Sequence, residues 1–220
     1  MLGIAGELIN NAHNDYFAYI NTNIGGLKTN QLIDEDIAHT IYPDKDGNVI
    51  HKLNLKRSHN GKDEGFSGTN FAYLRFYLPI GSKVLEIKNF EKKESIKKDS
   101  ATGMLYLEDK DEEYLGKAEV GDIDIYQEKD KTVLGVWQVI KPGQKIESEI
   151  IYQLPNNIKL TNGYTLLIQK QAGVLSQKYS LSFSNKDGNL SSNLENDCQN
   201  ETDGYQCGFE LKEDKTIVLY

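Results

Sequence analysis

The segment from Lys145 to Leu154 restricts the fold of this chain more than any other. Two sets of side chains alternate along it: Ile146, Ser148, Ile150, Tyr152 and Leu154 in one set, and Lys145, Glu147, Glu149 and Gln153 in the other. A period of two is that of a β-strand with one buried face, and it does not fit an α-helix. Because such a strand must cover its apolar face with a second layer, the segment predicts a packed β-protein.

Two neighbouring apolar runs extend this region to residues 131–173. One run surrounds Trp137, and the other covers residues 166–168. A Pro-Gly pair at 142–143 and an Asn-Gly pair at 162–163 lie between the runs, and both pairs favour tight turns because proline fixes φ and asparagine or glycine accepts positive φ. We therefore expect residues 131–173 to form an antiparallel meander around a core that contains Trp137.

Short alternating segments continue along most of the chain without interleaved helices. An Asp-Gly pair at 46–47 and a Lys-Asp pair at 129–130 each lie between two such segments and predict β-hairpins. Closely spaced strands of this kind build antiparallel sandwiches or barrels. The sequence predicts an all-β fold, an antiparallel β-sandwich of the immunoglobulin-like class.

The N-terminus departs from this pattern. Apolar residues recur there at helical spacing, at Ala5, Leu8, Ile9, Ala12, Tyr16, Tyr19 and Ile20. This spacing predicts a helix over residues 6–20 that ends before Gly25 and Gly26. We expect residues 1–26 to form a helix and linker, and residues 27–220 to form the sandwich with a C-terminal hairpin turning at 213–214.

Charge and hydropathy narrow the list of partners. The net charge of −8 at pH 7 disfavours nucleic acid and anionic membrane surfaces, which reward clustered Lys and Arg. No apolar run is long enough to span a bilayer, so membrane insertion by this segment is not expected. The first residues lack the pattern of a signal peptide, so an export signal or anchor is expected on a longer parent chain.

The chain contains two cysteines, Cys198 and Cys207, with eight residues between them in a turn-rich segment. Two free thiols in a reducing cytosol are one reading. We favour a disulfide that closes a hairpin loop, which indicates an oxidising compartment. The spacing is too wide for a redox CxxC motif, and no histidine lies nearby to complete a zinc site.

Catalytic and cofactor motifs are missing from the sequence. It contains no GxSxG or SxxK nucleophile pattern and no GxGxxG or GK[ST] phosphate loop, so we expect neither an enzyme nor a cofactor. His39 and His51 could meet across a hairpin as a metal pair. Because no third ligand is evident, we expect surface or partly buried histidines and no metal site.

One strand carries a stripe of three side chains that could bind a ligand. Tyr73, Arg75 and Tyr77 alternate with apolar residues and therefore share one face. Two tyrosines could stack on a sugar ring, and the guanidinium could hold a carboxylate. The alternative is ordinary cross-strand pairing, with Arg75 lying over the aromatic rings.

Several segments together resemble a bacterial family known as domain of unknown function 4012. They are YINTNIGGLKTNQLI, HKLNLKRSHNG, TNFAYLRFYLPIGSKV, TVLGVWQVIKPGQKIESEIIYQLP and YTLLIQKQAG, in that order over residues 15–175. The resemblance is to the C-terminal β-rich part of that family. It implies an outward-facing bacterial envelope protein whose larger N-terminal part and membrane anchor precede this segment, and it implies no established activity.

The family motifs fall on Asn21, Asn23, Gly25, Gly26 and Lys28, on Arg75, and on Gln169, Lys170 and Gln171. We interpret them as structural, since glycines permit a turn into the sheet and asparagine side chains bond the local backbone. An isopeptide crosslink at Lys28 or Lys170 is a further hypothesis. The function expected is a non-catalytic structural or interaction module on the bacterial cell surface, with a protein or glycan partner; the alternative is a carbohydrate-binding module for cell-wall or host glycan.

Overall fold

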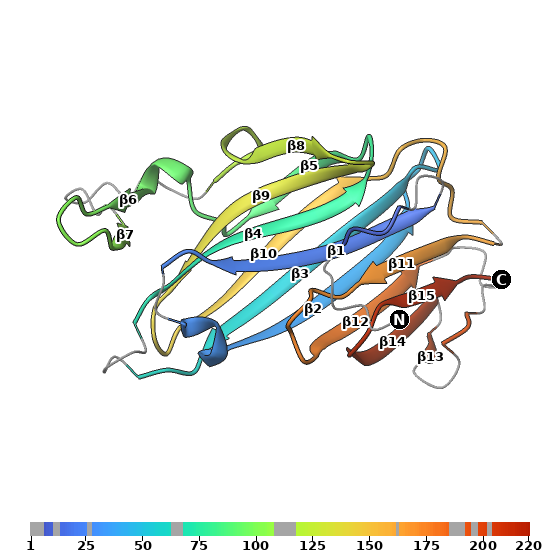
Figure 1. Ribbon diagram of the computed structural model, residues 1–220. Coiled ribbons are helices and arrows are strands. Elements are labelled where there is room, and N and C mark those ends of the chain that lie inside the picture. Colours follow the sequence, from blue (N-terminus) through green and yellow to red (C-terminus); the bar gives the residue numbers. More distant parts are fainter. Residues whose placement is uncertain are drawn as a thin grey trace.

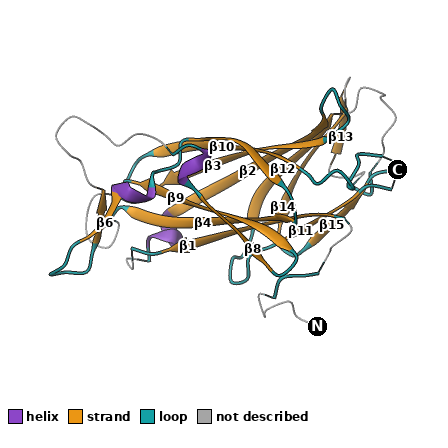
Figure 2. Ribbon diagram, turned by 90° about the horizontal axis from the view of Figure 1, so that it is seen from above, coloured by secondary structure: helices purple, strands orange, loops and turns teal. Residues whose placement is uncertain are grey.

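The computed structural model describes residues 7–10, 14–25, 28–62, 68–107, 118–161, 163–184, 192–194, 198–201 and 204–220. Two twisted sheets lie face to face (Figure 1), and Figure 2 shows them as two layers seen along their edges. The predicted all-β sandwich is confirmed. Its apolar core lies between the sheets and takes residues from both of them, from Phe17 near one end of the chain to Leu219 near the other.

The first sheet has six strands, in the order β15 (Lys215–Val218), β11 (Thr165–Gln169), β1 (Asp15–Asn23), β4 (Asn70–Pro79), β9 (Lys131–Ile140) and β8 (Asp124–Glu128). The second has seven, in the order β13 (Cys198–Glu201), β14 (Gly204–Leu211), β12 (Gln177–Ser184), β2 (Ile33–Pro43), β3 (Val49–His59), β10 (Lys145–Gln153) and β5 (Lys83–Lys88). A separate short hairpin pairs β6 (Ile96–Lys98) with β7 (Leu105–Leu107). Three 3-10 turns complete the described elements: η1 (Thr29–Leu32), η2 (Lys93–Ser95) and η3 (Val120–Asp122).

Each main sheet contains one parallel pair, so the sandwich is not wholly antiparallel as predicted. β1 runs parallel to β11, and β2 runs parallel to β12, while the other neighbours are antiparallel. The two pairs join the first quarter of the chain to its last third. Alternation along a strand cannot reveal such pairings, because it reports the buried face and not the direction of the neighbour.

The predicted N-terminal helix is wrong. Residues 15–23 form β1, an interior strand between β11 and β4. Phe17 and Tyr19 face the core, while Tyr16 and Ala18 are buried on the outer face, where Leu8 packs against them. A strand buried on both faces reads as a continuous apolar run, and such a run cannot be told from a helix by periodicity alone.

The predicted meander over residues 131–173 is also wrong, although its strands exist. β9 pairs with β4 and β8 in the first sheet, β10 pairs with β3 and β5 in the second, and β11 returns to the first. The Pro-Gly turn, with Gly143 at φ 77°, therefore carries the chain from one layer to the other. Trp137 lies on the outer face and is partly exposed, while its neighbours Val136 and Gln138 face inward.

The last two strands do not form the expected C-terminal hairpin. β14 pairs with β12 and β13 in the second sheet, whereas β15 pairs with β11 in the first. The residues between them cross the sandwich. The hairpins predicted at 46–47 and 129–130 are confirmed, since β2 pairs with β3 and β8 with β9.

The predicted disulfide is confirmed. Cys198 on β13 bonds to Cys207 on β14, and the two residues are direct cross-strand partners with Cα atoms 4.0 Å apart. Cys207 is buried against the core. The bond therefore holds the outermost strand of the second sheet onto its neighbour.

Replacing both cysteines by alanine is expected to lower the free energy of unfolding by about 2–3 kcal/mol, because the bond closes a short loop in the unfolded chain. Urea unfolding followed by tryptophan fluorescence measures the change. A reductant should destabilise the wild type by a similar amount and leave the double variant unchanged. Equal midpoints for oxidised and reduced wild type would contradict this account of β13.

Candidate functional site

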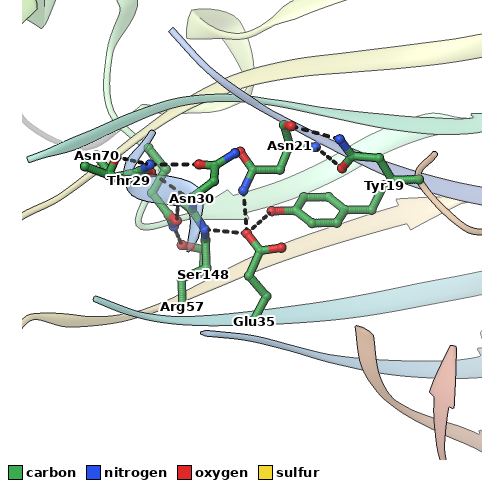
Figure 3. A network of polar contacts seen from close by, with 10 residues as sticks. Tyr19, Asn21, Thr29, Asn30, Glu35, Arg57, Asn70 and Ser148 are labelled. Carbon is green, nitrogen blue, oxygen red and sulfur yellow. Dashed lines mark hydrogen bonds and ion pairs between the residues drawn. The ribbon is translucent and has the colours of Figure 1, made fainter. Parts of the chain in front are cut away.

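The interior of the sandwich changes from apolar to polar at the end next to η1. Seven strands each contribute a polar side chain to this end of the interior: Asn21 on β1, Glu35 on β2, Arg57 on β3, Asn70 on β4, Gln138 on β9, Ser148 on β10 and Gln177 on β12. We call these residues the polar end. Figure 3 shows part of it, with side chains from both sheets converging on Arg57 and Glu35.

Arg57 is the centre of the polar end and is fully buried. Its Nε donates to Glu35 Oε1 at 2.8 Å, its Nη1 to Gln138 Oε1 at 2.9 Å, and its Nη2 to Asn70 Oδ1 at 3.0 Å. Two of these acceptors belong to the first sheet and one to the second. A buried guanidinium is tolerated only when its donors are bonded, so the acceptors fix how the two sheets meet here.

Asn70 and Gln138 also form hydrogen bonds to neighbouring polar groups. Asn70 Nδ2 lies 2.9 Å from Thr29 Oγ1, which ties β4 to η1. Gln138 Nε2 donates to Ser148 Oγ at 2.5 Å, and that hydroxyl donates to the carbonyl of Asn89 at 3.0 Å. Because each side chain uses both its donor and its acceptor, the network is satisfied on the side away from solvent.

Glu35 faces the outside of this network. Its Oε1 accepts from Arg57, from the Tyr19 hydroxyl at 2.9 Å and from Asn21 Nδ2 at 2.7 Å. Among the described residues no hydrogen bond reaches its Oε2. Burial, together with the carboxylate of Glu35, keeps the pKa of Tyr19 well above 10, so this phenol stays protonated and donates.

The Gln-Lys-Gln motif ties β11 and its following loop to β1. The Gln171 side chain donates to the carbonyl of Asn21 at 3.0 Å and accepts from its amide at 2.8 Å, as a paired strand would. Gln169 accepts from the Tyr16 hydroxyl at 2.5 Å. Lys170 Nζ donates to two loop carbonyls, those of Gln171 and Val174, and among the described residues no carboxylate pairs with it. The crosslink stays a hypothesis.

The Asn-rich motif begins at the end of β1 and continues into the turn before η1. Asn23 accepts from the amide of Gly25 at 3.0 Å and donates to Thr29 Oγ1 at 3.1 Å. Lys28 is exposed and has φ 51°. Gly26 lies outside the described residues. The structural role of the motif stays a prediction.

A pocket opens over the polar end, between the end of β1, the start of β2, the loop before β12 and the end of β14. Its volume is about 280 Å³. Asn21, Glu35, Gln171 and Gln177 are among its lining residues. Two lining atoms, Asn21 Oδ1 and Gln177 Nε2, are buried without a hydrogen-bond partner among the described residues. Two residues that line the pocket therefore carry a buried acceptor and a buried donor without a partner among the described residues.

A second polar cluster lies deeper, and it contains both candidate metal histidines. His39 Nε2 lies 2.7 Å from His51 Nδ1, and His39 Nδ1 lies 2.5 Å from the Tyr179 hydroxyl. His51 Nε2 lies 3.1 Å from Asp15 Oδ2, and the Tyr164 hydroxyl donates to that same oxygen. All five side chains are buried, contrary to the expectation of surface or partly buried histidines.

The hydrogen bonds of this cluster suit a neutral His39. In that arrangement Tyr179 donates to His39 Nδ1, and His39 Nε2–H donates to His51 Nδ1. Burial, and secondly the neighbouring His51, hold the pKa of His39 well below 6.5. No group of three or more His, Cys, Asp and Glu that could hold a metal ion occurs among the described residues.

The Tyr73–Arg75–Tyr77 stripe lies on the outer face of the first sheet. Tyr77 is only 3% exposed, whereas Tyr73 and Arg75 reach solvent in part. The Tyr73 hydroxyl donates to Asp124 at 2.7 Å, and its ring crosses Gly135, where a Cβ would collide with it. Arg75 donates to the Tyr77 hydroxyl at 3.1 Å. Burial raises the pKa of Tyr77 to about 12.

The comparisons with known proteins support the fold alone. No family model and no curated protein matches the sequence. The chain is similar to the crystal structure of a "putative nutrient binding protein" from Legionella pneumophila, with a TM-score of 0.52 and 9% identity over 95% of this chain and 72% of that one. An M1 zinc metallopeptidase from Deinococcus radiodurans gives a TM-score of 0.30 and 8% identity over 84% of this chain and 42% of that one, which is too low to carry an argument.

Sequence reasoning placed Asn21 and Gln171 in motifs but missed Glu35, Arg57 and Gln177. A signal for them exists in the alternation of the strands. Arg57 continues the inward series that includes Leu55, and Gln177 continues the one that includes Tyr179. A charged or amide residue at an inward position indicates either a strand end or a buried polar network.

Replacing Arg57 by methionine is expected to lower the free energy of unfolding by about 3–5 kcal/mol, because Glu35 then keeps a charge without its buried partner. Urea unfolding measures the loss. Lys56→Met removes the neighbouring, largely exposed cation, which pairs with Glu147, and should leave the midpoint nearly unchanged. Adding Glu35→Leu to Arg57→Met should restore part of the stability, and equal effects of the two single variants would contradict the assignment.

Stability is expected to fall as the pH drops below about 6.5, since unfolded His39 binds a proton there and folded His39 does not. The slope approaches about 1.4 kcal/mol per pH unit for one group. Unfolding curves between pH 5 and pH 8 measure it, above the range in which carboxylates titrate. His39→Gln should remove this slope whatever its effect on absolute stability. An unchanged slope in that variant would contradict the assignment of the pH dependence to His39.

Proposed function

We propose that this chain is a non-catalytic, extracytoplasmic interaction module of a bacterial cell-envelope protein, carried on a longer membrane-anchored chain. The observation that carries the proposal is the pocket over the polar end. Its lining combines a rigidly held carboxylate, Glu35, with unused polar atoms of Asn21 and Gln177. A small concave site with a few convergent polar groups is typical of binding, and here its walls come from both sheets.

The disulfide supports an oxidising location outside the cytoplasm. The described part of the chain has no helix with the length and hydropathy that a bilayer crossing needs. The resemblance to domain of unknown function 4012, and the immunoglobulin-like class within the sandwiches, remain predictions that agree with this location. The description of the Legionella protein as nutrient-binding applies to that protein, and it agrees with a binding role for the fold.

A non-catalytic role fits the burial of the histidine cluster. His39, His51 and Asp15 have the side chains that acid–base chemistry uses, yet each is at most 1% exposed. A general base must come within hydrogen-bond distance of its substrate. The tyrosines packed around these residues separate them from solvent. The role that we propose for the cluster is therefore to stabilise the core.

The alternative function, carbohydrate binding, is favoured by one feature of the outer face of the first sheet. Tyr73 and Trp137 are cross-strand partners with ring centroids 5.2 Å apart, both partly exposed. Trp137 Nε1 has no hydrogen-bond partner among the described residues. Together with Arg75, this pair could serve as a stacking platform for a sugar ring. The Tyr77 ring is buried, and its hydroxyl accepts a hydrogen bond from Arg75.

The main proposal is tested on intact bacteria that produce the natural protein. A membrane-impermeant amine-reactive biotin reagent should label the chain, and alkylation under denaturing, non-reducing conditions should find no free thiol at Cys198 or Cys207. A cytoplasmic protein of the same cells serves as the unlabelled control. A chain that the biotin reagent does not label and that carries two reactive thiols would overturn the proposal.

The alternative is tested on a glycan array with the purified chain. Specific binding that Tyr73→Ala abolishes would favour it, whereas a flat array would discard it. Tyr106→Ala is the matched control, because Tyr106 is a 47% exposed tyrosine on β7, away from this face.

A further inference from the structure

We propose that the pocket over the polar end binds the ammonium group of a lysine side chain, together with a carbonyl oxygen of the same ligand. This inference rests on the proposed interaction function and names the chemistry of its ligand. A free amino acid and a lysine in a peptide segment share this chemistry.

The charge of the lining selects a cation. Four carboxylates surround the pocket, from Asp34, Glu35, Asp36 and Glu210. The lining contains one cationic side chain, Lys178, which is 74% exposed and lies 3.9 Å from Asp36. At this distance and exposure the lysine neutralises little of the charge. Arg57 pairs with Glu35 at 2.8 Å, and the exposed Lys212 lies 3.3 Å from Glu210. Asp34 and Asp36 therefore carry most of the negative charge that the lining presents. The remaining negative potential is focused by the walls of the pocket and attracts a positive ligand.

Two lining acceptors are free to bond an ammonium group. Glu35 is held in place through Oε1 by three donors, and no described residue bonds its Oε2. Asn21 uses its Nδ2 on Glu35, which leaves its buried Oδ1 without a partner in the described structure. A lysine ammonium has three donors and no acceptor. It therefore has enough donors for both oxygens, and it needs no donor from the chain.

A third lining group needs an acceptor from the ligand. Gln177 is 5% exposed, and its position on β12 points it between the sheets. Its Nε2 has no hydrogen-bond partner among the described residues. A buried donor without a partner is unfavourable and rare in native proteins. A carbonyl oxygen of the ligand would accept a hydrogen bond from Gln177 Nε2, whereas an ammonium group has no acceptor to offer.

The remaining lining suits an aliphatic stem. Ile33 and Val174 line the same pocket, and methylene groups can pack on them while the charged end meets the carboxylates. No aromatic ring occurs among the described lining residues. Sugars and quaternary ammonium groups are usually held on aromatic faces, so the lining favours a primary ammonium over either of them.

Isothermal titration calorimetry at low ionic strength tests the proposal with the purified, oxidised chain. The probe is Nα-acetyl-lysine methylamide, and the matched neutral probe is Nα-acetyl-norleucine methylamide. We expect saturable binding of the lysine probe that weakens with added salt, and no binding of the norleucine probe. Free lysine and N-acetylglucosamine are titrated in parallel, the first to separate a free amino acid from a peptide-borne one and the second to test a sugar.

Two variants separate binding from folding. Gln177→Leu removes a donor that has no described partner, so the unfolding midpoint should stay or rise while the affinity for the lysine probe falls about tenfold. Asp36→Asn should weaken binding roughly threefold, because Asp36 is exposed and contributes charge alone. Glu94→Gln removes an exposed carboxylate outside the pocket and should change neither quantity.

The outcomes distinguish this inference from the proposed function. No saturable binding of the lysine probe, equal binding of the norleucine probe, or preference for the sugar would each overturn the ligand assignment. Destabilisation by Gln177→Leu with unchanged affinity would show that Gln177 is structural and overturn it as well. A surface-labelled, disulfide-bonded protein that fails these titrations keeps its proposed location, whereas a lysine-binding chain found reduced in the cytoplasm loses the location alone.

Discussion

The buried guanidinium of Arg57 sets the arrangement at one end of this sandwich. Its three hydrogen bonds reach Glu35 in its own sheet and Gln138 and Asn70 in the other. Apolar surfaces pack in many nearly equivalent ways, but a buried charge is acceptable only where its donors are bonded. We infer that these bonds restrict how the two sheets can slide over each other, much as a buried polar residue fixes the register of a coiled coil.

The histidine cluster joins the same two layers at a second place. Asp15 comes from β1 of the first sheet and Tyr164 directly precedes β11 of that sheet, while His39, His51 and Tyr179 come from the second. The two clusters differ in their access to solvent. The cluster of His39 is sealed by tyrosines, whereas the polar end carries a pocket whose lining keeps unused donors and acceptors. That difference is why we place binding at the polar end and a structural role in the cluster.

Several parts of the fold follow from local residues. The strands, the Asp-Gly and Lys-Asp hairpins and the single disulfide were predictable, because alternation, turn chemistry and cysteine spacing act over short distances along the chain. Strand β1 was not predicted, and a helix over residues 6–20 was expected in its place, because β1 is buried on both faces and loses its alternation. Of the candidate site, Asn21 and Gln171 were visible in sequence motifs. Glu35 and Gln177 could be assigned to the site only once the structure showed that they line the same pocket.

The sequence by itself determined the all-β class of the sandwich and the pairing of its two cysteines. It also determined which face of most strands is buried. Tertiary structure alone decided which strands are neighbours: β9, β10 and β11 follow one another in the chain but alternate between the sheets. It also decided that polar residues from seven strands meet at one end. The physical reason is that strand alternation records burial, which either sheet can provide, while pairing and convergence depend on contacts between segments far apart in sequence.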